Sequence, residues 1–509
     1  MAKNLTTGSP WRVILMFAVP LLIGNVIQQL YHVADAIVVG RWLGVDALAA
    51  VGATGALLFL LLGFAWGMTS GFAIPTAQAF GARDDAAVRR SVAAGTILTA
   101  IVSVVLTVGA PLIAEPLLQL LQTPPELLAD ATVFAQISFL GAGTMMFFNY
   151  LSAIIRAIGD SRTPLVFLTI ACILNVVLVV LMVGPLEWGV GGAALATVLS
   201  QAVSVLLCLE YVRRRVRVLW ITRADFHVTR AELREHLRLG LPMGFQASII
   251  AIGTLTVQVA LNRLGSDAVA AYTAASRVDG LAVALLMSLG LAVSMFVAQN
   301  HGGGRPDRIR RGVVQAVWMA IAGAVILGAL LVAFGAPVVR IFVGDAADEV
   351  VDLAHLMLII NGVSYSALGV LFVLRGTLQG LGDAMIPTVT GVVELVMRVV
   401  AALVLGSLFG FAGVAWSNPL AWFGAVLILV PAYLAAHRKL ALLPVNPAEV
   451  TLTTPIPVVG PTDGSMVVDA IVTQPITLPQ QHGASQRGHL IRILPRRRSG
   501  QPRRRSDAR

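Results

Sequence analysis

The chain carries one stretch twice: residues 41–50 read RWLGVDALAA, and residues 262–271 read NRLGSDAVAA. Further landmarks recur at nearly the same interval of about 220 residues, namely Gln78 with Gln299, Gly159-Asp160 with Gly382-Asp383, and Gly192 with Gly413. A repeat of this length indicates two homologous halves. In a very apolar chain, two such halves favour two membrane lobes that face each other, an arrangement typical of transporters.

The composition indicates a membrane protein. Of the 509 residues, 57% are hydrophobic and only 12% are charged, whereas a soluble domain carries about 25% charged residues. The apolar runs are long enough to cross a bilayer, which takes about 20 residues each. Because these runs are continuous rather than alternating, they predict an all-α membrane protein and not a barrel.

Twelve apolar segments are predicted to span the membrane, six in each half. They lie at approximately residues 13–39, 46–73, 90–111, 131–156, 164–184, 190–212, 240–262, 267–297, 312–336, 353–375, 387–408 and 411–436. Alternate loops are rich in arginine, and positively charged loops stay in the cytoplasm. We therefore expect a multi-pass protein of the cell (inner) membrane with both termini in the cytoplasm. Because six is even, the two six-helix lobes should be parallel and related by a pseudo-twofold axis along the membrane normal.

This pattern divides the chain into four predicted parts. Residues 1–212 form an N-lobe and residues 239–440 a C-lobe, joined by a basic cytoplasmic linker over residues 213–238. The tail, residues 441–509, lacks a helical period and carries nine arginines against four acidic residues. We expect it to be disordered and to touch anionic membrane lipid, with no nucleic acid as a partner.

The first predicted helix carries a stripe of polar side chains. Asn25, Gln28, Gln29, His32 and Asp35 follow at intervals of three or four residues, which places them on one helical face. A carboxylate at the centre of a spanning helix costs about 2.5–3.5 kcal/mol, so the stripe should face water or the other lobe. Interhelical hydrogen bonds that only hold the bundle together are the alternative explanation.

Asp35 is the strongest candidate for a functional residue in this stripe. Desolvation favours the neutral form of a carboxyl group, so such a group can take a proton on one side of the membrane and release it on the other. His32, one turn away, either shares that proton or completes an interhelical hydrogen bond. Pro20 in the same span and its counterpart Pro242 should kink their helices, as moving parts or as static bends.

The second half has a different polar set. Arg277 and Asp279 lie near the middle of the eighth span, two residues apart, so they should point to different faces and not pair. Glu394 and Arg398 lie four residues apart in the eleventh span, in the order that favours an ion pair. That pair is predicted to be structural, or else to act in gating or coupling.

One stretch carries a family resemblance, from Pro20-Leu21-Leu22-Ile23-Gly24-Asn25 through Tyr31, Asp35 and Gly44 to Ala47-Leu48-Ala49-Ala50-Val51-Gly52. It is similar to the first helix and following loop of the multidrug and toxic compound extrusion (MATE) family, closest to its DinF-like prokaryotic branch. The resemblance covers about residues 11–440. It implies two lobes around a central cavity, whose polar face includes Tyr31 beside Asn25 and the two glutamines. It also implies an antiporter that expels organic cations or other amphipaths in exchange for protons or sodium ions.

The resemblance further implies a cation site in the N-lobe. In that branch, the first-helix aspartate acts with an Asn and an Asp on the fifth helix and a Thr on the sixth, and Asp35, Asn175 and Thr197 match three of the four. The remaining position holds Val179, so a sodium ion would find fewer anionic oxygens there. We therefore expect proton coupling at Asp35, with sodium as the alternative ion and no firm metal site.

The leading prediction is a secondary active multidrug efflux antiporter that works by alternating access, without a cofactor and as a monomer. The sequence contains no Gly-x-x-x-x-Gly-Lys-Ser/Thr motif for ATP, so an ion gradient must supply the work. A flippase for a lipid-linked precursor shares the superfamily plan. It would need several basic groups in the cavity, where the spans offer only Arg277, Arg398 and Arg375.

Two other classes of protein fit the sequence less well. An enzyme is not expected, because no nucleophile–base pair or metal cluster appears at membrane depth. The two cysteines, Cys172 and Cys208, lie within apolar spans and are expected to pack there. A non-transporting membrane scaffold or receptor would have no need of the polar stripe.

Overall fold

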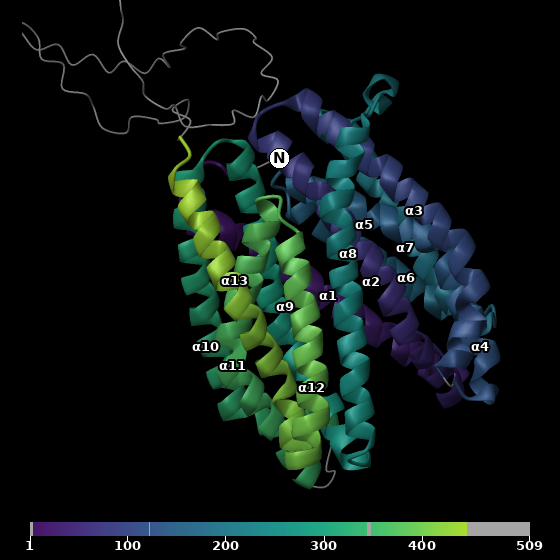
Figure 1. The fold of residues 1–509 in the computed structure, drawn as a ribbon. Coiled ribbons are helices and arrows are strands. Elements are labelled where there is room, and N and C mark those ends of the chain that lie inside the picture. The colour runs from purple at the N-terminus through teal and green to yellow at the C-terminus, as the bar shows by residue number, and fades with distance from the viewer. Residues whose placement is uncertain (1–3, 122, 344–347, 445–509) are drawn as a thin grey trace, which may run out of the picture. The chain divides into compact units, whose positions relative to one another are not determined.

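The computed structural model describes residues 4–121, 123–343 and 348–444, all within one compact unit, Met1–Glu449 (Figure 1). These residues form α-helices and two short 3₁₀ helices, with no strand in the described ranges. The N-lobe helices are α1 (Pro10–Leu43), α2 (Val45–Gly81), α3 (Asp85–Leu120), α4 (Pro125–Leu140), α5 (Ala142–Ala157), α6 (Arg162–Val183) and α7 (Gly189–Arg215). The 3₁₀ helices η1 (Arg217–Leu219) and η2 (Arg223–Phe226) follow. The C-lobe helices are α8 (Arg230–Asn262), α9 (Ser266–Gly302), α10 (Pro306–Val343), α11 (Asp348–Gly380), α12 (Met385–Ala415) and α13 (Ser417–Ala441).

The prediction of an all-α fold with twelve spans is confirmed. By length and composition, 11 described helices can cross a membrane, and the pair α4 and α5, bent by 47°, makes 12 if it counts as one span. The helices are longer than the apolar segments; α3, for example, has 36 residues, a length of about 54 Å. Hydropathy detects only the part inside the hydrocarbon core of about 30 Å, and the helices continue beyond it.

The duplication is visible in the backbone. Glycines with positive φ occur at equivalent points of the two halves: Gly44 (89°) and Gly265 (106°), Gly159 (85°) and Gly382 (91°), and Gly189 (58°) and Gly410 (59°). Glycine adopts this conformation without the steric penalty of a side chain. The two halves therefore turn in the same way at the same places. Gly410 is also a break inside α12, close to the predicted boundary between the last two spans.

The two lobes meet along α1 and α2 on one side and α8 and α9 on the other. Gly67 and Gly71 of α2 lie against Met243 and Gly240 of α8, so closely that a methyl group on either α2 glycine would clash with α8 backbone. Gly244 lies one turn beyond Gly240 and faces Phe64 of α2. Small residues four apart let helix backbones approach closely in a membrane, and we call this contact the glycine seam.

One end of the bundle carries the arginine-rich loops after α2 and α9, and we call it the basic end. Arg308 donates to the backbone oxygen of Gly8 at 2.7 Å, and Arg310 donates to His437 at 3.1 Å. These bonds bring the start of α1, the start of α10 and the end of α13 to the same end, which is the upper end in Figure 1. This placement agrees with an even number of spans.

The predicted linker is ordered and held to the N-lobe. Asp225 of η2 pairs with Arg89 at 3.4 Å, and Glu232 at the start of α8 pairs with Arg90 at 3.1 Å. Hydrogen bonds from Thr222, together with Arg89, hold the pKa of the Asp225 carboxyl below its usual range. Of the tail predicted to be disordered, residues 445–509 lie outside the described residues.

Candidate ion-coupling site

Two side chains predicted for the N-lobe site, Asn175 and Thr197, lie together with Tyr31, which was predicted for the polar cavity face. Thr197 of α7 donates its hydroxyl hydrogen to the backbone oxygen of Ala193 at 3.2 Å. Its oxygen therefore accepts from the Tyr31 hydroxyl of α1 at 3.0 Å and from the Asn175 amide of α6 at 3.1 Å. In the sequence, Asn175 is 22 residues and Tyr31 is 166 residues from Thr197. The packing of α1, α6 and α7 brings them together.

Asp35 lies one turn beyond Tyr31 and is half-buried. Its Oδ1 atom is enclosed by protein and has no hydrogen-bond partner in the described part of the chain, and the same is true of Oδ1 of Asn175, which is fully buried. Within the described ranges, no hydrogen bond joins Asp35 to Asn175 or Thr197. An enclosed acceptor without a donor costs about 1–3 kcal/mol. Each of these oxygens can therefore accept an added donor or cation.

The rest of the polar stripe has mixed surroundings. Asn25 donates to Ser288 of α9 at 2.9 Å and so links the two lobes. Gln28, Gln29 and His32 are exposed. The His32 ring lies 5.0 Å from the Tyr31 ring, and no described hydrogen bond joins His32 to Asp35. The predicted proton relay from His32 is therefore not formed in this conformation.

Val179 occupies the position at which the family resemblance implies a second carboxylate. It is fully buried and packs with Val39 and Val183 in an apolar cluster. The wall of the N-lobe site is therefore apolar on this side. In the described ranges, no group of three or more His, Cys, Asp or Glu side chains forms a metal site.

The two prolines lie within continuous helices. Pro20 is buried in α1, and Pro242 lies in α8. The backbone oxygen of Pro242 accepts from Thr388 of α12 at 3.0 Å. Whether either helix bends at its proline during function stays a prediction.

In the C-lobe, Asp279 of α9 is the centre of a cluster of buried hydrogen bonds. Its Oδ1 atom accepts from Asn361 at 2.9 Å and from the Tyr365 hydroxyl at 2.6 Å, both on α11. Asp279 is buried whereas Arg277 is exposed, so the two lie on different faces of α9. Sequence reasoning missed Asn361 and Tyr365. Their spacing of four residues on one face of an apolar span was the available signal.

The partner predicted for Glu394 is wrong. Glu394 of α12 forms its ion pair with Arg375 of α11, and both side chains are buried. Arg398, one turn further along α12, lies against Gly253 of α8, and its Nε atom is enclosed without a partner in the described structure. The spacing within α12 predicted a pair of Glu394 with Arg398. The packing of α11 on α12 instead brings Arg375 into an ion pair with Glu394.

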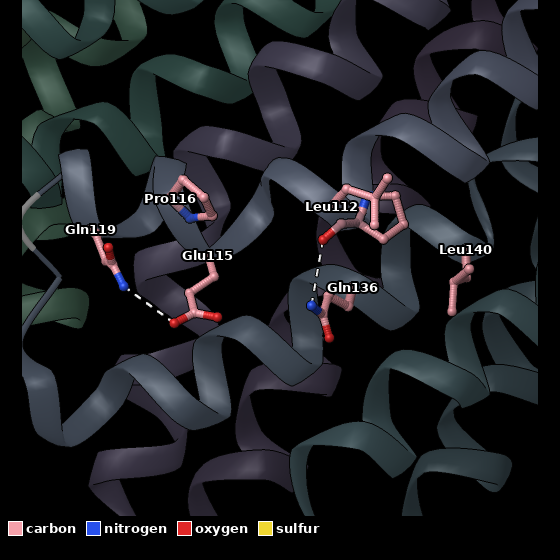
Figure 2. A pocket seen from close by; sticks show the side chains of 7 residues that line it. Leu112, Glu115, Pro116, Gln119, Gln136 and Leu140 are labelled. Atoms are coloured by element: carbon pink, nitrogen blue, oxygen red, sulfur yellow. Dashed lines mark hydrogen bonds between the residues drawn. The ribbon is translucent and has the colours of Figure 1, made fainter.

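A groove of about 600 Å³ lies apart from both clusters, between α3 and α4 (Figure 2). It is lined by Pro111, Leu112, Glu115, Pro116, Gln119, Gln136 and Leu140. Gln119 donates to the Glu115 carboxylate at 3.2 Å, and Gln136 donates to the backbone oxygen of Pro111 at 3.4 Å; the side chains of Gln119, Glu115 and Gln136 are labelled in Figure 2. The groove contains none of the predicted site residues.

The fold and the buried polar clusters define a class of protein, a two-lobed α-helical membrane transporter. The MatE family model matches residues 20–181 and 242–424, and the chain belongs to this family. Members of the family are transporters and not enzymes.

Curated relatives have names that describe drug resistance and transport. "Probable multidrug resistance protein YoeA" of Bacillus subtilis (strain 168) is 31% identical over 393 residues, which are 75% of this chain and 84% of that protein. An "FAD transporter" of Shewanella oneidensis is 24% identical, over 78% of this chain and 88% of that protein.

Solved structures share the fold. A structure described as the outward-facing conformation of a multidrug resistance MATE family transporter has a TM-score of 0.79 at 24% identity. It covers 86% of this chain and 98% of its own. A Pyrococcus furiosus transporter of the MOP superfamily has a TM-score of 0.78 at 24% identity, with 86% and 97% covered.

Proposed function

We propose that this chain is a secondary active exporter of organic cations or other amphipathic compounds, driven by protons that enter through Asp35. The main supporting observation is that one oxygen of Asp35 and one oxygen of Asn175 are enclosed and have no donor among the described residues. A proton on Asp35 gives the site a donor, and its loss restores a charge that water or a cationic substrate can stabilise. Curated relatives named as multidrug resistance proteins support the export of varied compounds.

Protons are proposed over sodium because the site has a single carboxylate. Sodium would have to be held by Asp35 together with neutral oxygens of Asn175, Thr197 and Tyr31, beside the apolar Val179. A hard cation gains most from several anionic or carbonyl oxygens arranged around it. A proton needs only one acceptor.

The arginine-rich loops support the orientation. Positively charged loops stay in the cytoplasm, so we place the basic end, and with it the start of α1 and the end of α13, on the cytoplasmic side of the cell membrane. In this conformation the glycine seam joins the lobes along α2 and α8. Export then requires the lobes to rock between this arrangement and one that opens toward the cytoplasm.

A flippase for a lipid-linked anionic precursor is less well supported. Such a headgroup needs unpaired positive charge in the cavity. Arg375 is neutralised by Glu394, and Arg398 is buried against Gly253 of α8. Arg277 is the exposed member of the predicted basic set, and one cation makes a weak site for a phosphate-bearing headgroup.

Reconstituted vesicles test the proposal. Wild-type protein should transport a fluorescent organic cation under an imposed proton gradient and not under a sodium gradient alone. Asp35→Asn keeps the size of the side chain and removes the titrating group, so it should abolish gradient-driven transport. Asp279→Asn is the matched control, with one buried carboxylate replaced in the other lobe. Undiminished proton-driven transport by Asp35→Asn would exclude Asp35 from coupling, and transport driven by sodium alone would replace the proton with sodium.

A further inference from the structure

We infer that Gln78 and Gln299 hold the two lobes together at the basic end, each by a hydrogen bond to the opposite lobe, and that they favour the closed arrangement of the lobes during transport. We call this pair of contacts the latch. The inference rests on the alternating access proposed above. These glutamines are equivalent in the two repeats, one at the end of α2 and the other at the end of α9. Neither belongs to the candidate ion-coupling site.

The two hydrogen bonds mirror each other across the lobe boundary. Gln78 of the N-lobe donates to the backbone oxygen of Gly380, the last residue of α11, at 2.9 Å. Gln299 of the C-lobe donates to the backbone oxygen of Ala157, the last residue of α5, at 2.6 Å. Each glutamine therefore reaches the same point of the opposite lobe.

The acceptors suit a reversible contact. The carbonyls in the last turn of a helix have no donor within that helix, so Gly380 and Ala157 accept from the glutamines without losing a backbone bond. When the lobes separate, water replaces both partners, because the groups lie at helix ends. A neutral bond exchanged for water changes an equilibrium by a modest factor, as a contact broken in every cycle requires.

Close backbone contacts between the lobes accompany the two hydrogen bonds. Gly81 lies against the carbonyl of Gln299, and Gly302 lies against the carbonyl of Gln78. A methyl group at either glycine would overlap the opposite backbone. Glycine at these two equivalent positions is therefore required for this closed arrangement of the lobes, independently of the fold within each lobe.

The N-terminal segment, residues 4–8, adds to one half of the latch. The side-chain oxygen of Gln299 accepts from the backbone nitrogen of Leu5 at 2.9 Å, and Asn300 donates to the Leu5 oxygen at 3.2 Å. Leu5 is buried, and Arg308 donates to the Gly8 oxygen at 2.7 Å. Gln299 thus holds two segments of the N-lobe, whereas the amide nitrogen of Gln78 holds one helix end of the C-lobe.

Distance measurements between the lobes test the latch in the full chain. Spin labels are attached at Arg162→Cys and Met385→Cys, which are exposed, equivalent positions at the basic end. Cys172→Ala and Cys208→Ala remove the native thiols. Pulsed electron resonance then gives the populations of short (closed) and long (open) distances in lipid vesicles.

Loss of one neutral hydrogen bond should shift the closed-to-open ratio about three- to ten-fold toward open in Gln78→Ala. Gln299→Ala should shift it further, because the bond from Leu5 is lost too. Gln136→Ala is the matched control, since Gln136 donates to a backbone oxygen within one lobe, and it should leave the ratio unchanged. Gly302→Ala should remove the short-distance population while each lobe stays folded, as judged by helical content and monodispersity.

The possible failures are distinct. If the wild type shows two distances but both glutamine variants match Gln136→Ala, the latch is rejected and the proposed transport cycle stands. If Gly302→Ala retains the wild-type short distance, the close backbone contact is rejected as a requirement for closure. If the wild type shows one distance at every pH and with substrate, alternating access itself is overturned, and the latch with it.

Discussion

The carboxylates of the two lobes differ in how fully they are satisfied, although enclosed polar atoms without a partner in the described structure occur in both lobes, including Asn361 Oδ1 and Arg398 Nε in the C-lobe. In the N-lobe, Asp35 and Asn175 each keep an enclosed oxygen without a donor in the described structure. In the C-lobe, Asp279 accepts from two donors, and Glu394 is paired with Arg375. Both lobes arose from one repeat, but their carboxylates lie on different helices, α1 in the first and α9 and α12 in the second.

This difference separates two uses of a buried charge. A carboxylate with its donors in place contributes rigidity, because removing any member leaves another uncompensated. A carboxylate that lacks donors is held ready for a mobile partner such as a proton. We therefore propose that the N-lobe cluster couples transport to an ion and that the C-lobe clusters stabilise the fold.

The largest expected effect on stability comes from Glu394→Gln. It leaves Arg375 buried without a counter-charge, which should cost about 3–5 kcal/mol, measured by thermal or denaturant unfolding in detergent. Replacing both partners, in Arg375→Met with Glu394→Met, should be less damaging than the single change. A Glu394→Gln protein that is as stable as the wild type but uncoupled would reverse the roles of the two lobes.

Asp279→Asn should have the next largest effect. The amide can still accept from Tyr365 and Asn361, but each bond should fall from the range for charged acceptors, about 1.5–3 kcal/mol, to that for neutral ones, about 0.5–1.5 kcal/mol. The transition should shift in the same unfolding assay while the dependence of transport on the proton gradient is retained. Loss of proton dependence in this variant would place a second coupling group in the C-lobe.

Val179→Asp tests the ion preference of the N-lobe site by adding the carboxylate that the family resemblance implies. Two carboxylates near Asn175 should bind sodium, and binding to the folded state alone stabilises by about 1.4 kcal/mol at ten times the dissociation constant. The measurement is thermal stability with sodium against the same concentration of choline. An equal response of the variant and the wild type would show that Val179 is not the determinant of ion choice.

The smallest expected effect is that of Tyr31→Phe. It removes one neutral hydrogen bond to Thr197, worth about 0.5–1.5 kcal/mol, and leaves the ring in place. Proton-driven transport should persist at a rate within a few-fold of the wild type. Complete loss of transport would instead make the Tyr31 hydroxyl part of the proton path.

Much of the architecture was accessible from the sequence because it depends on local composition. The duplication and the apolar runs predicted two sets of six spans, and the intervals of three and four residues predicted the polar face of the first helix. The ends of the helices were not accessible, since hydropathy measures the thickness of the hydrocarbon core and not where the helix stops.

Pairing between helices was the part that the sequence could not supply. Glu394 was assigned to Arg398 because the rule for one helix concerns residues four apart, whereas its partner comes from another helix. Tyr31 was recognised as polar, but nothing in its spacing connected it to Thr197. Gln78 and Gln299 were recognised only as a repeated landmark. An uncharged side chain near the end of a span does not stand out as a polar group inside the membrane.

The glycine seam has a consequence for the energy of opening. Parting two helices that interlock through leucines would wet large hydrocarbon surfaces, at about 1.5–3 kcal/mol for each side chain. At Gly67 and Gly71 the facing surface is α8 backbone, whereas Gly240 and Gly244 face the rings of Phe72 and Phe64. Parting α2 from α8 would therefore wet two aromatic rings along with peptide backbone, so the hydration penalty of opening is concentrated at Phe64 and Phe72.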